Sequence, residues 1–340
     1  MVIEEPSDQS LLGRTFDQYQ NFMQIARCVK EAARQTSITR PRVLELYRRP
    51  SGLAEYFPEA DLIRHATHTN DQPSLPSPIH LPFPDKSFDA CVISDVYEHL
   101  PQAQRPELLG EMIRVTSGLV MVGSPVANET VTRCDKIVFD FIWGKYAERF
   151  EPLTQHVTFG LEPLEDIVAS LKSQGADRVI LLPCNYVYRW IHQLLIYFDL
   201  QHRQPYAGIY EPLTRIYNER LSAYDYREPC YRYLIVVAVD PRLDADAFSQ
   251  RLTGPCEVPA TVAETDGLLL QEFLAINNRA GDALREKDEE IARLKESLAH
   301  AEREIERLAN AAAQENRWGW FKLRSLLSRL RKALSAPARK

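Results

Sequence analysis

Residues 81–100 read Leu81-Pro-Phe-Pro-Asp-Lys-Ser-Phe-Asp-Ala-Cys-Val-Ile-Ser-Asp-Val-Tyr-Glu-His-Leu100, and this stretch decides the fold. Its central segment, Phe88–Ser94, is mostly apolar, which is typical of a strand that a sheet buries on both faces. A helical pattern follows at Pro106–Val115, and a further apolar strand is expected at Gly118–Gly123. A strand, a helix and a strand in this order indicate a sheet covered by helices.

The same alternation continues along the chain in both directions. Helices are expected at residues 10–36, Gly52–Phe57 and Pro163–Gln174, and strands at Arg42–Tyr47, Asp61–His65, Arg178–Leu182 and Tyr233–Val239. Gly175 is well suited to end the helix that precedes it, because glycine readily adopts the left-handed conformation found after helices. The pattern as a whole predicts an α/β fold with helices on both faces of the sheet.

Composition and charge limit the possible partners. Of the 340 residues, 45% are hydrophobic and 26% are charged, so the chain can bury a sizeable core. Eight of the 41 Lys and Arg residues lie in residues 317–340, which contain no acid, so the other 33 face 47 Asp and Glu residues. Because this acidic remainder repels polyanions, we expect no nucleic-acid partner outside the basic end.

The cysteines and the hydropathy indicate a cytoplasmic protein. The six cysteines are scattered without a Cys-x-x-Cys pair, so we expect reduced thiols and no metal site. Residues 1–6 are acidic and do not begin a signal peptide. The longest apolar run, Leu234–Val239, is much shorter than the ~20 residues of a membrane-spanning helix. We therefore expect no segment that crosses a bilayer.

The composition changes after residue 240 and predicts three further segments. Residues 1–240 form the α/β domain, residues 241–266 have the composition of a linker, and residues 267–315 carry a heptad repeat. Its a positions are Leu284, Ile291, Leu298, Ile305 and Ala312. Asn277 continues the series backward, and Asn at an a position favours a parallel two-stranded coiled coil, hence a homodimer. The alternative is a single amphipathic helix packed on the domain.

Residues 316–340 are expected to form a basic amphipathic helix. One face carries Trp320 and four leucines, and basic residues cover the remainder. Together with Trp318 and Phe321, this face suits a peripheral contact with the cytoplasmic side of an anionic membrane. A solvated basic end of the coiled coil is the alternative interpretation.

Three groups of residues together resemble the class I S-adenosylmethionine-dependent methyltransferases, in the branch called type 11. They are Leu81–Asp89, the segment Glu98-His99-Leu100, and Glu111 with Arg114-Val115 in the following helix. The resemblance covers about residues 40–240. It implies a Rossmann-like sheet with a late antiparallel strand pair at its edge, S-adenosylmethionine as cofactor, and methyl transfer as the activity.

The same resemblance assigns the cofactor positions, several of which are altered. In the family, the first strand ends in an acidic residue, here Glu45, followed by Gly-x-Gly-x-Gly. The three glycine positions hold Tyr47, Arg49 and Ser51, and Gly52 is the glycine nearby. Ser77 stands where the family has an Asp beside the adenine, and residues 63–67 end the second strand without a carboxylate. The motif is therefore degenerate. Side chains occupy positions at which the glycines of the family leave the backbone open to the cofactor.

Candidate catalytic residues follow the Phe88–Ser94 strand. Asp95 and His99 lie at its carboxyl end, where α/β sheets bind ligands, and His99 can serve as a general base toward a hydroxyl. A purely structural histidine there is equally compatible with the sequence. Residues 126–232 resemble the helical cap of methyltransferases encoded with cell-surface polysaccharide enzymes. His156 and Arg189 are the acceptor-binding candidates in this cap.

Two functions remain open at this point. The first is methyl transfer from S-adenosylmethionine to a glycan or another small hydroxyl acceptor, with Glu45, Gly52 and Ser77 beside the cofactor. The second is a catalytically inactive methyltransferase fold that serves as a membrane-associated scaffold or binding module in polysaccharide assembly. Glycan-assembly enzymes would then be its partners.

Overall fold

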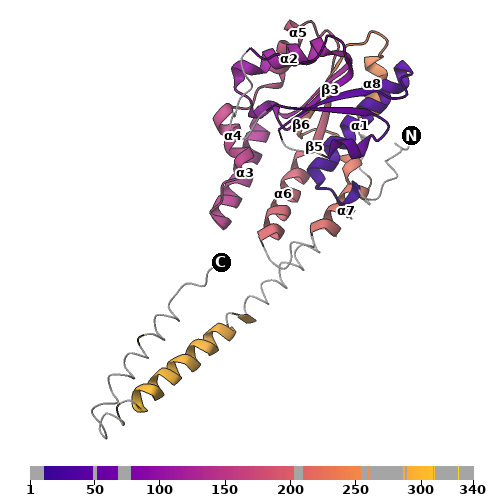
Figure 1. Cartoon of the computed structure of the whole chain (residues 1–340). Helices are drawn as coiled ribbons and strands as arrows, with labels where there is room; N and C mark the ends of the chain where they lie inside the picture. Colours follow the sequence, from indigo (N-terminus) through magenta and orange to yellow (C-terminus); the bar gives the residue numbers. More distant parts are fainter. Residues whose placement is uncertain are drawn as a thin grey trace. The chain divides into compact units, whose positions relative to one another are not determined.

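The computed structural model describes residues 11–48, 52–67, 78–202, 210–253, 259, 286–287, 289–308, 310 and 328. The chain divides into two units, Met1–Leu269 and Leu270–Lys340. Figure 1 shows that the first unit contains a sheet flanked by helices.

The sheet has six strands in the order β2-β1-β3-β4-β6-β5. They are β1 (Arg42–Tyr47), β2 (Asp61–Ala66), β3 (Phe88–Ser94), β4 (Thr116–Pro125), β5 (Val179–Tyr186) and β6 (Cys230–Ala238). The first four strands are parallel, whereas β6 runs antiparallel to both β4 and β5. The expected mixed sheet with a late antiparallel pair at its edge is confirmed.

Helices cover both faces of this sheet. The bounds are α1 (Phe16–Thr36), α2 (Arg105–Val115), α3 (Glu129–Tyr146), α4 (Glu151–Phe159), α5 (Leu164–Ser173), α6 (Val187–His202), α7 (Tyr210–Arg220) and α8 (Ala245–Leu252). Buried residues of α1 and α8 pack with Val92 of β3, whereas those of α2 and α5 pack with Cys91 and Ile93 of the same strand. Successive side chains of a strand point to opposite faces, so an apolar strand such as β3 contributes to both cores.

The stretch that decides the fold is held in place at the start of β3. The carboxylate of Asp89 accepts a hydrogen bond from the backbone N–H of Arg42 at 2.8 Å, which ties the start of β3 to β1. Gly118 is required where β4 approaches β3, because a Cβ atom there would lie 2.2 Å from the carbonyl oxygen of Asp89. These backbone contacts explain why Asp89 is structural and takes no part in chemistry at the opposite end of the strand.

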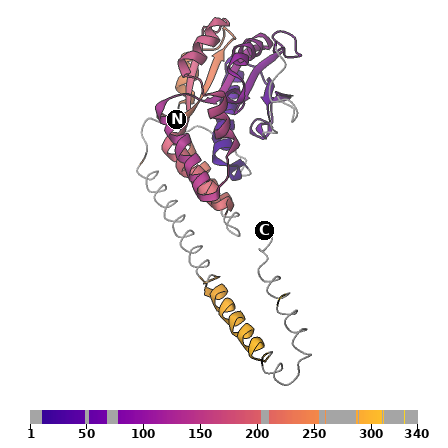
Figure 2. The same cartoon turned by 90° about the vertical axis from the view of Figure 1, so that its left-hand side faces the viewer.

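Four helices build a cap, but it is not continuous in sequence. Helices α3, α4, α6 and α7 lie within residues 126–232, and strand β5 of the sheet separates the first pair from the second. Figures 1 and 2 show α3 and α6 side by side, below the sheet in both views. The expected all-helical cap is therefore corrected to two helical pairs with a sheet strand between them.

Two smaller expectations also need correction. The helix expected at Gly52–Phe57 is a short 3-10 turn, η2 (Leu53–Tyr56). Part of the segment expected as a linker, residues 241–266, forms α8 instead. Asp244 caps this helix by accepting from the backbone N–H groups of Asp246 and Ala247, and Phe248 is fully buried against the core. The folded domain thus continues past residue 240.

The described part of the second unit is helical over residues 289–308. Ile291, Leu294, Leu298 and Leu308 are 38–62% exposed in the single chain. An apolar row of this kind agrees with the heptad pattern, and pairing with a second chain stays a prediction. Asn277 and the membrane-contact candidates Trp318, Trp320 and Phe321 lie outside the described residues. Among the described helices, none combines the length and the hydropathy that spanning a membrane requires.

Candidate functional site

A cavity of about 570 Å³ opens at the carboxyl ends of β1 and β3. This is the end of a parallel sheet at which α/β proteins bind ligands. Residues of β1, of the loop after β3, of α4, of α6 and of β6 line it, among them Glu45, Tyr47, Asp95, Glu98, His99, His156, Trp190, Tyr231 and Arg232. The cavity therefore lies between the sheet and the helical cap.

The structure brings most of the predicted site residues to this cavity. Glu45, Asp95, His99 and His156 all line it, although they come from β1, the β3 loop and α4. Gly52 has a positive φ of 83° and begins η2, so it shapes the neighbouring turn, while the next residue, Leu53, contacts the cavity. Ser77 lies outside the described residues.

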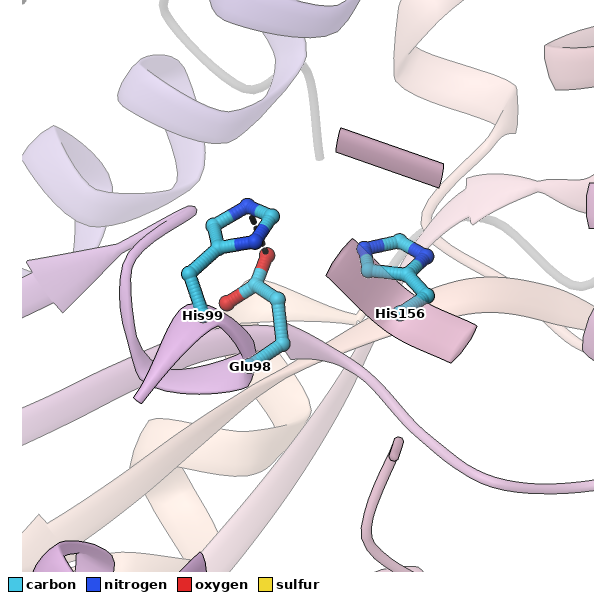
Figure 3. A group of neighbouring side chains, drawn as sticks. All are labelled: Glu98, His99 and His156. Carbon is cyan, nitrogen blue, oxygen red and sulfur yellow. Dashed lines mark ion pairs between the residues drawn. The ribbon is translucent and has the colours of Figure 1, made fainter. Parts of the chain in front are cut away.

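Three buried side chains that line the cavity form a polar cluster, which Figure 3 shows: Glu98, His99 and His156. Glu98 and His99 sit on η3 (Tyr97–His99), a 3-10 turn that directly follows β3. The imidazole rings of His99 and His156 are stacked, with centroids 5.5 Å apart and planes at 21°. The Nε2 atom of His99 lies 3.9 Å from Oε1 of Glu98.

His156 is oriented by a carboxylate from another helix. Its Nδ1 atom lies 2.9 Å from Oδ2 of Asp135, which is on α3. The hydroxyl of Tyr231 donates to the other oxygen of Asp135 at 2.6 Å, and the indole of Trp190 stacks on the Tyr231 ring with centroids 3.5 Å apart. Since a carboxylate only accepts hydrogen bonds, Nδ1 carries the proton of this contact and Nε2 is the ring nitrogen that Asp135 leaves unoccupied.

A buried guanidinium joins α1, the β3 loop and β6 beside this cluster. Arg232 on β6 forms ion pairs with Asp95 and with Asp17 of α1, the latter at 3.2 Å. The side-chain amide of Asn21 also donates to Asp95 at 3.3 Å. These contacts hold Asp95 in a left-handed conformation with a φ of 57°.

Burial raises the pKa values of two carboxyl groups that line the cavity. Desolvation, aided by the nearby Asp95 carboxylate, raises the pKa of Glu98 to about 7, although His156 and Arg232 act in the opposite direction. Desolvation likewise raises the pKa of Asp17 to about 6 against the attraction of Arg232. Both carboxyl groups therefore hold their protons to a higher pH than exposed carboxyl groups do.

The cavity residues around Glu45 show how well the site fits S-adenosylmethionine. A volume of about 570 Å³ is within the range of small-molecule and cofactor sites, and the buried carboxylate of Glu45 faces it. However, Arg64 of β2 already donates to Glu45 at 3.0 Å. Tyr47, which stands at the first of the three glycine positions, also lines the cavity, as does the neighbouring Arg48. The space and the acidic residue fit the cofactor, and the glycine cradle is missing.

Arg48 contacts the helical cap. Its guanidinium donates to the side-chain oxygen of Gln155 at 2.6 Å, which links the end of β1 to α4 of the cap. Arg49 and Ser51, which follow it at the other altered glycine positions, lie outside the described residues.

Arg189 is not in the cavity, so its expected acceptor-binding role is corrected. Its guanidinium forms a buried ion pair with Asp225, and the hydroxyl of Tyr217 donates to the same carboxylate at 2.7 Å. The pair joins α6 to the segment that leads into β6. Arg232 lines the cavity beside the polar cluster instead, and the sequence motif Tyr231-Arg-Tyr233 was the signal that could have identified it.

Part of the sheet domain matches a known protein family. Residues 58–119, which include β2, β3 and α2, match the family model described as a methyltransferase domain. This match supports the class I methyltransferase superfamily. No curated protein matches the chain.

Similar solved structures are distant. The YcgJ protein of Bacillus subtilis is 14% identical to this chain, with a TM-score of 0.32. The matched region covers 59% of this chain and 92% of the YcgJ chain. Phosphoethanolamine N-methyltransferase 2 of Haemonchus contortus, solved with phosphomonomethylethanolamine and S-adenosylhomocysteine, is 14% identical over 63% of this chain and 52% of its own, with a TM-score of 0.37. The [4+2]-cyclase SpnF is 14% identical over 65% and 82%, with a TM-score of 0.37.

Proposed function

We propose that this chain transfers a methyl group from S-adenosylmethionine to a hydroxyl of a glycan or another small acceptor. The observation that carries the proposal is that one cavity is lined both by the acidic Glu45 and by the Glu98–His99–His156 cluster. A donor bound beside Glu45 and an acceptor bound beside the cluster would share this space. The match of residues 58–119 to a methyltransferase domain supports the same reaction class.

Methyl transfer requires the protein mainly to align the acceptor with the methyl donor. S-adenosylmethionine supplies an electrophilic methyl group when bound, and bringing an acceptor oxygen into line with it accounts for most of the rate. The proton of the acceptor hydroxyl passes to the imidazole of His99. Asp95 is the poorer proton acceptor, because Arg232 and Asn21 already hold its carboxylate.

Aromatic side chains support an acceptor that contains a sugar ring. The stacked pair of Trp190 and Tyr231 lines the cavity close to the polar cluster. A flat aromatic surface next to hydrogen-bonding groups suits the apolar face of a sugar and its hydroxyls. The resemblance of residues 126–232 to caps of polysaccharide-associated methyltransferases points to the same class of acceptor.

Binding of the cofactor is the first test. We expect isothermal titration calorimetry of the full chain with S-adenosylmethionine or S-adenosylhomocysteine to show saturable binding. Glu45→Gln should weaken that binding, and Glu55→Gln, an exposed carboxylate paired with Arg14 outside the cavity, should leave it unchanged. No heat at high protein concentration would exclude the methyltransferase proposal.

One observation favours a second function, a cofactor-free binding module. Arg64 occupies the Glu45 carboxylate, and the side chains of Tyr47 and Arg48 stand at the end of β1. In this proposal the cavity binds a glycan without altering it, and the chain acts as a scaffold for glycan-assembly enzymes. Saturable binding of an oligosaccharide without any binding of S-adenosylmethionine would support it.

The second unit supplies proposals about assembly. We propose that the heptad segment pairs two copies of the chain in parallel, because its apolar row is exposed in one copy. The basic segment that follows is proposed to rest on the cytoplasmic face of an anionic membrane. These proposals concern location and assembly, and they are compatible with either function of the cavity.

A further inference from the structure

We infer that Glu98, His99 and His156 form a binding site for a divalent transition-metal ion, with Zn²⁺ as the best match. Each residue offers one ligand atom, and these atoms lie within 4.8 Å of one another. Two imidazoles and one carboxylate are a set that binds zinc in catalytic centres, where a fourth position stays open for water or substrate. The inference concerns metal binding alone and does not rest on the proposed methyl transfer; with an ion bound, His99 would be a ligand and would no longer accept the proton of the acceptor hydroxyl.

The distances require a small closure around the ion. A tetrahedral ion with bonds of about 2.1 Å holds its ligand atoms about 3.4 Å apart. The Nε2 atom of His99 and Oε1 of Glu98 are already 3.9 Å apart. Binding would require side-chain rotation to bring the remaining atoms inward; His99 and Glu98 lie on one short turn, and His156 faces them from α4 (Figure 3).

The surroundings of His156 are those of a metal ligand. Asp135 accepts from Nδ1 at 2.9 Å and so presents the Nε2 lone pair to the cluster. Tyr231 in turn holds Asp135 through a hydrogen bond of 2.6 Å. Carboxylates that orient a ligating histidine in this way fix its tautomer and increase its basicity.

The local charge also favours a cation. Among the described residues that line the cavity, the carboxylates are Asp17, Glu45, Asp95, Glu98 and Glu151, and the guanidiniums are Arg48 and Arg232. The ligand residues themselves are 3–8% exposed, so water screens their interaction with an ion only weakly. Because all three nevertheless line the cavity, the open position of the ion faces the space where a substrate oxygen would lie.

The experiment uses the full chain without a histidine tag, stripped of metal by a chelator and dialysed. Titration with Zn²⁺ in a calorimeter, and with Co²⁺ followed by its visible absorption, should show one ion bound per chain. His99→Gln and His156→Gln should each abolish saturable binding. Asp135→Asn should weaken it by about 10–100-fold, as expected for a residue that orients a ligand.

His202→Gln is the matched control. His202 also pairs with a carboxylate, Glu148, at 2.9 Å, but it lies on α6 away from the cavity, so this variant should bind the ion as the unaltered chain does. Because a ligand variant can also misfold, the melting temperature is measured with and without Zn²⁺. The ion should raise it in the unaltered chain and in His202→Gln but not in His156→Gln.

Two results overturn the inference: no saturable binding of either ion to the unaltered chain, or equal binding by the His99 and His156 variants. In that case the cluster is a hydrogen-bonded group, and His99 remains available as the proton acceptor of the proposed reaction. Metal binding without binding of S-adenosylmethionine would instead support the metal site and exclude the methyltransferase proposal, so the two failures are distinguishable.

Discussion

Arg114 and Glu111 form a double ion pair on α2, with both nitrogen–oxygen distances at 2.7 Å. The pair also clamps the loop before β3. Arg114 donates to the carbonyl oxygens of Leu81 and Phe83 at 3.0 and 2.9 Å, and Glu111 accepts from the backbone N–H of Leu81 at 2.7 Å. The residues by which the sequence resembles methyltransferases are therefore those that bind this loop to the helix.

Removing the guanidinium should destabilise the domain. Arg114→Ala leaves the Leu81 and Phe83 carbonyl oxygens and the Glu111 carboxylate without their donor. We expect a loss of about 2–3 kcal/mol in the free energy of unfolding, the usual scale for hydrogen bonds to charged groups. Urea denaturation measures this loss. The control is Arg133→Ala, at an exposed position on α3, which should change the free energy of unfolding by less than about 0.5 kcal/mol. Equal losses in the two variants would contradict the clamp.

The same pair predicts a pH dependence. Hydrogen bonds from Arg114 lower the pKa of Glu111 below its ordinary value of 4.5. The folded pKa lies below the unfolded one, so this stabilisation is present above pH 4.5 and is lost as the pH falls through the folded pKa. Glu111→Gln should therefore be less stable than the unaltered chain at neutral pH and should approach it in acid. A stability difference that is the same at both pH values would be inconsistent with this assignment.

The sequence predicted the fold well because local patterns decide it. The strands β3 and β6 contain the apolar runs Ala90–Ile93 and Leu234–Ala238, and such a run is typical of a strand that is buried on both faces. The helix α8 escaped prediction because Pro and Asp residues around it resemble a linker. Its signals were present: Asp244 at the N-cap, and Phe248 and Leu252 four residues apart on one face.

The site was harder to predict, because its members meet only in three dimensions. His99 and Asp95 could be placed from β3 alone, since the carboxyl end of a parallel strand is where ligands bind. Asp135 carries no sequence signal of its role, which depends on α3 packing beside α4 and β6. Arg189 and Arg232 both lie in aromatic segments, and only their partners, Asp225 and Asp95, distinguish a structural ion pair from a cavity residue.

Arg232 should be essential for the stability of the cavity wall. Arg232→Ala removes the buried guanidinium that pairs with the Asp17 carboxylate, whose side chain is 30% exposed, so we expect a loss of about 1–3 kcal/mol, less than for a fully buried pair. Adding Asp17→Asn removes that uncompensated charge, so the double variant should recover part of the loss. Thermal and urea denaturation of the three proteins measure this. A double variant that is less stable than Arg232→Ala would contradict the network.

The exposed heptad row predicts a dimer. Leu294, 62% exposed in one chain, should be buried in a coiled coil, so Leu294→Asp should dissociate the dimer, whereas Glu296→Ala should not. Asn277→Leu tests the register, because loss of the Asn pair should broaden the distribution of oligomeric states. Sedimentation velocity distinguishes these outcomes. A monomeric unaltered chain at high concentration would rule out the coiled coil.

The basic end of the chain should bind anionic membranes by two additive contributions. Its eight Lys and Arg residues attract anionic lipid, and each contributes about 1 kcal/mol near the surface, an attraction that salt screens. The indoles of Trp318 and Trp320 add burial in the headgroup region. Replacing both by Ser should release the full chain from phosphatidylserine vesicles in a sedimentation assay, while Trp143→Ser, a tryptophan 48% exposed on α3, should not. If binding were electrostatic alone, the Ser variant would still bind at low salt as strongly as the unaltered chain, and the amphipathic helix would be a basic, solvated end of the coiled coil.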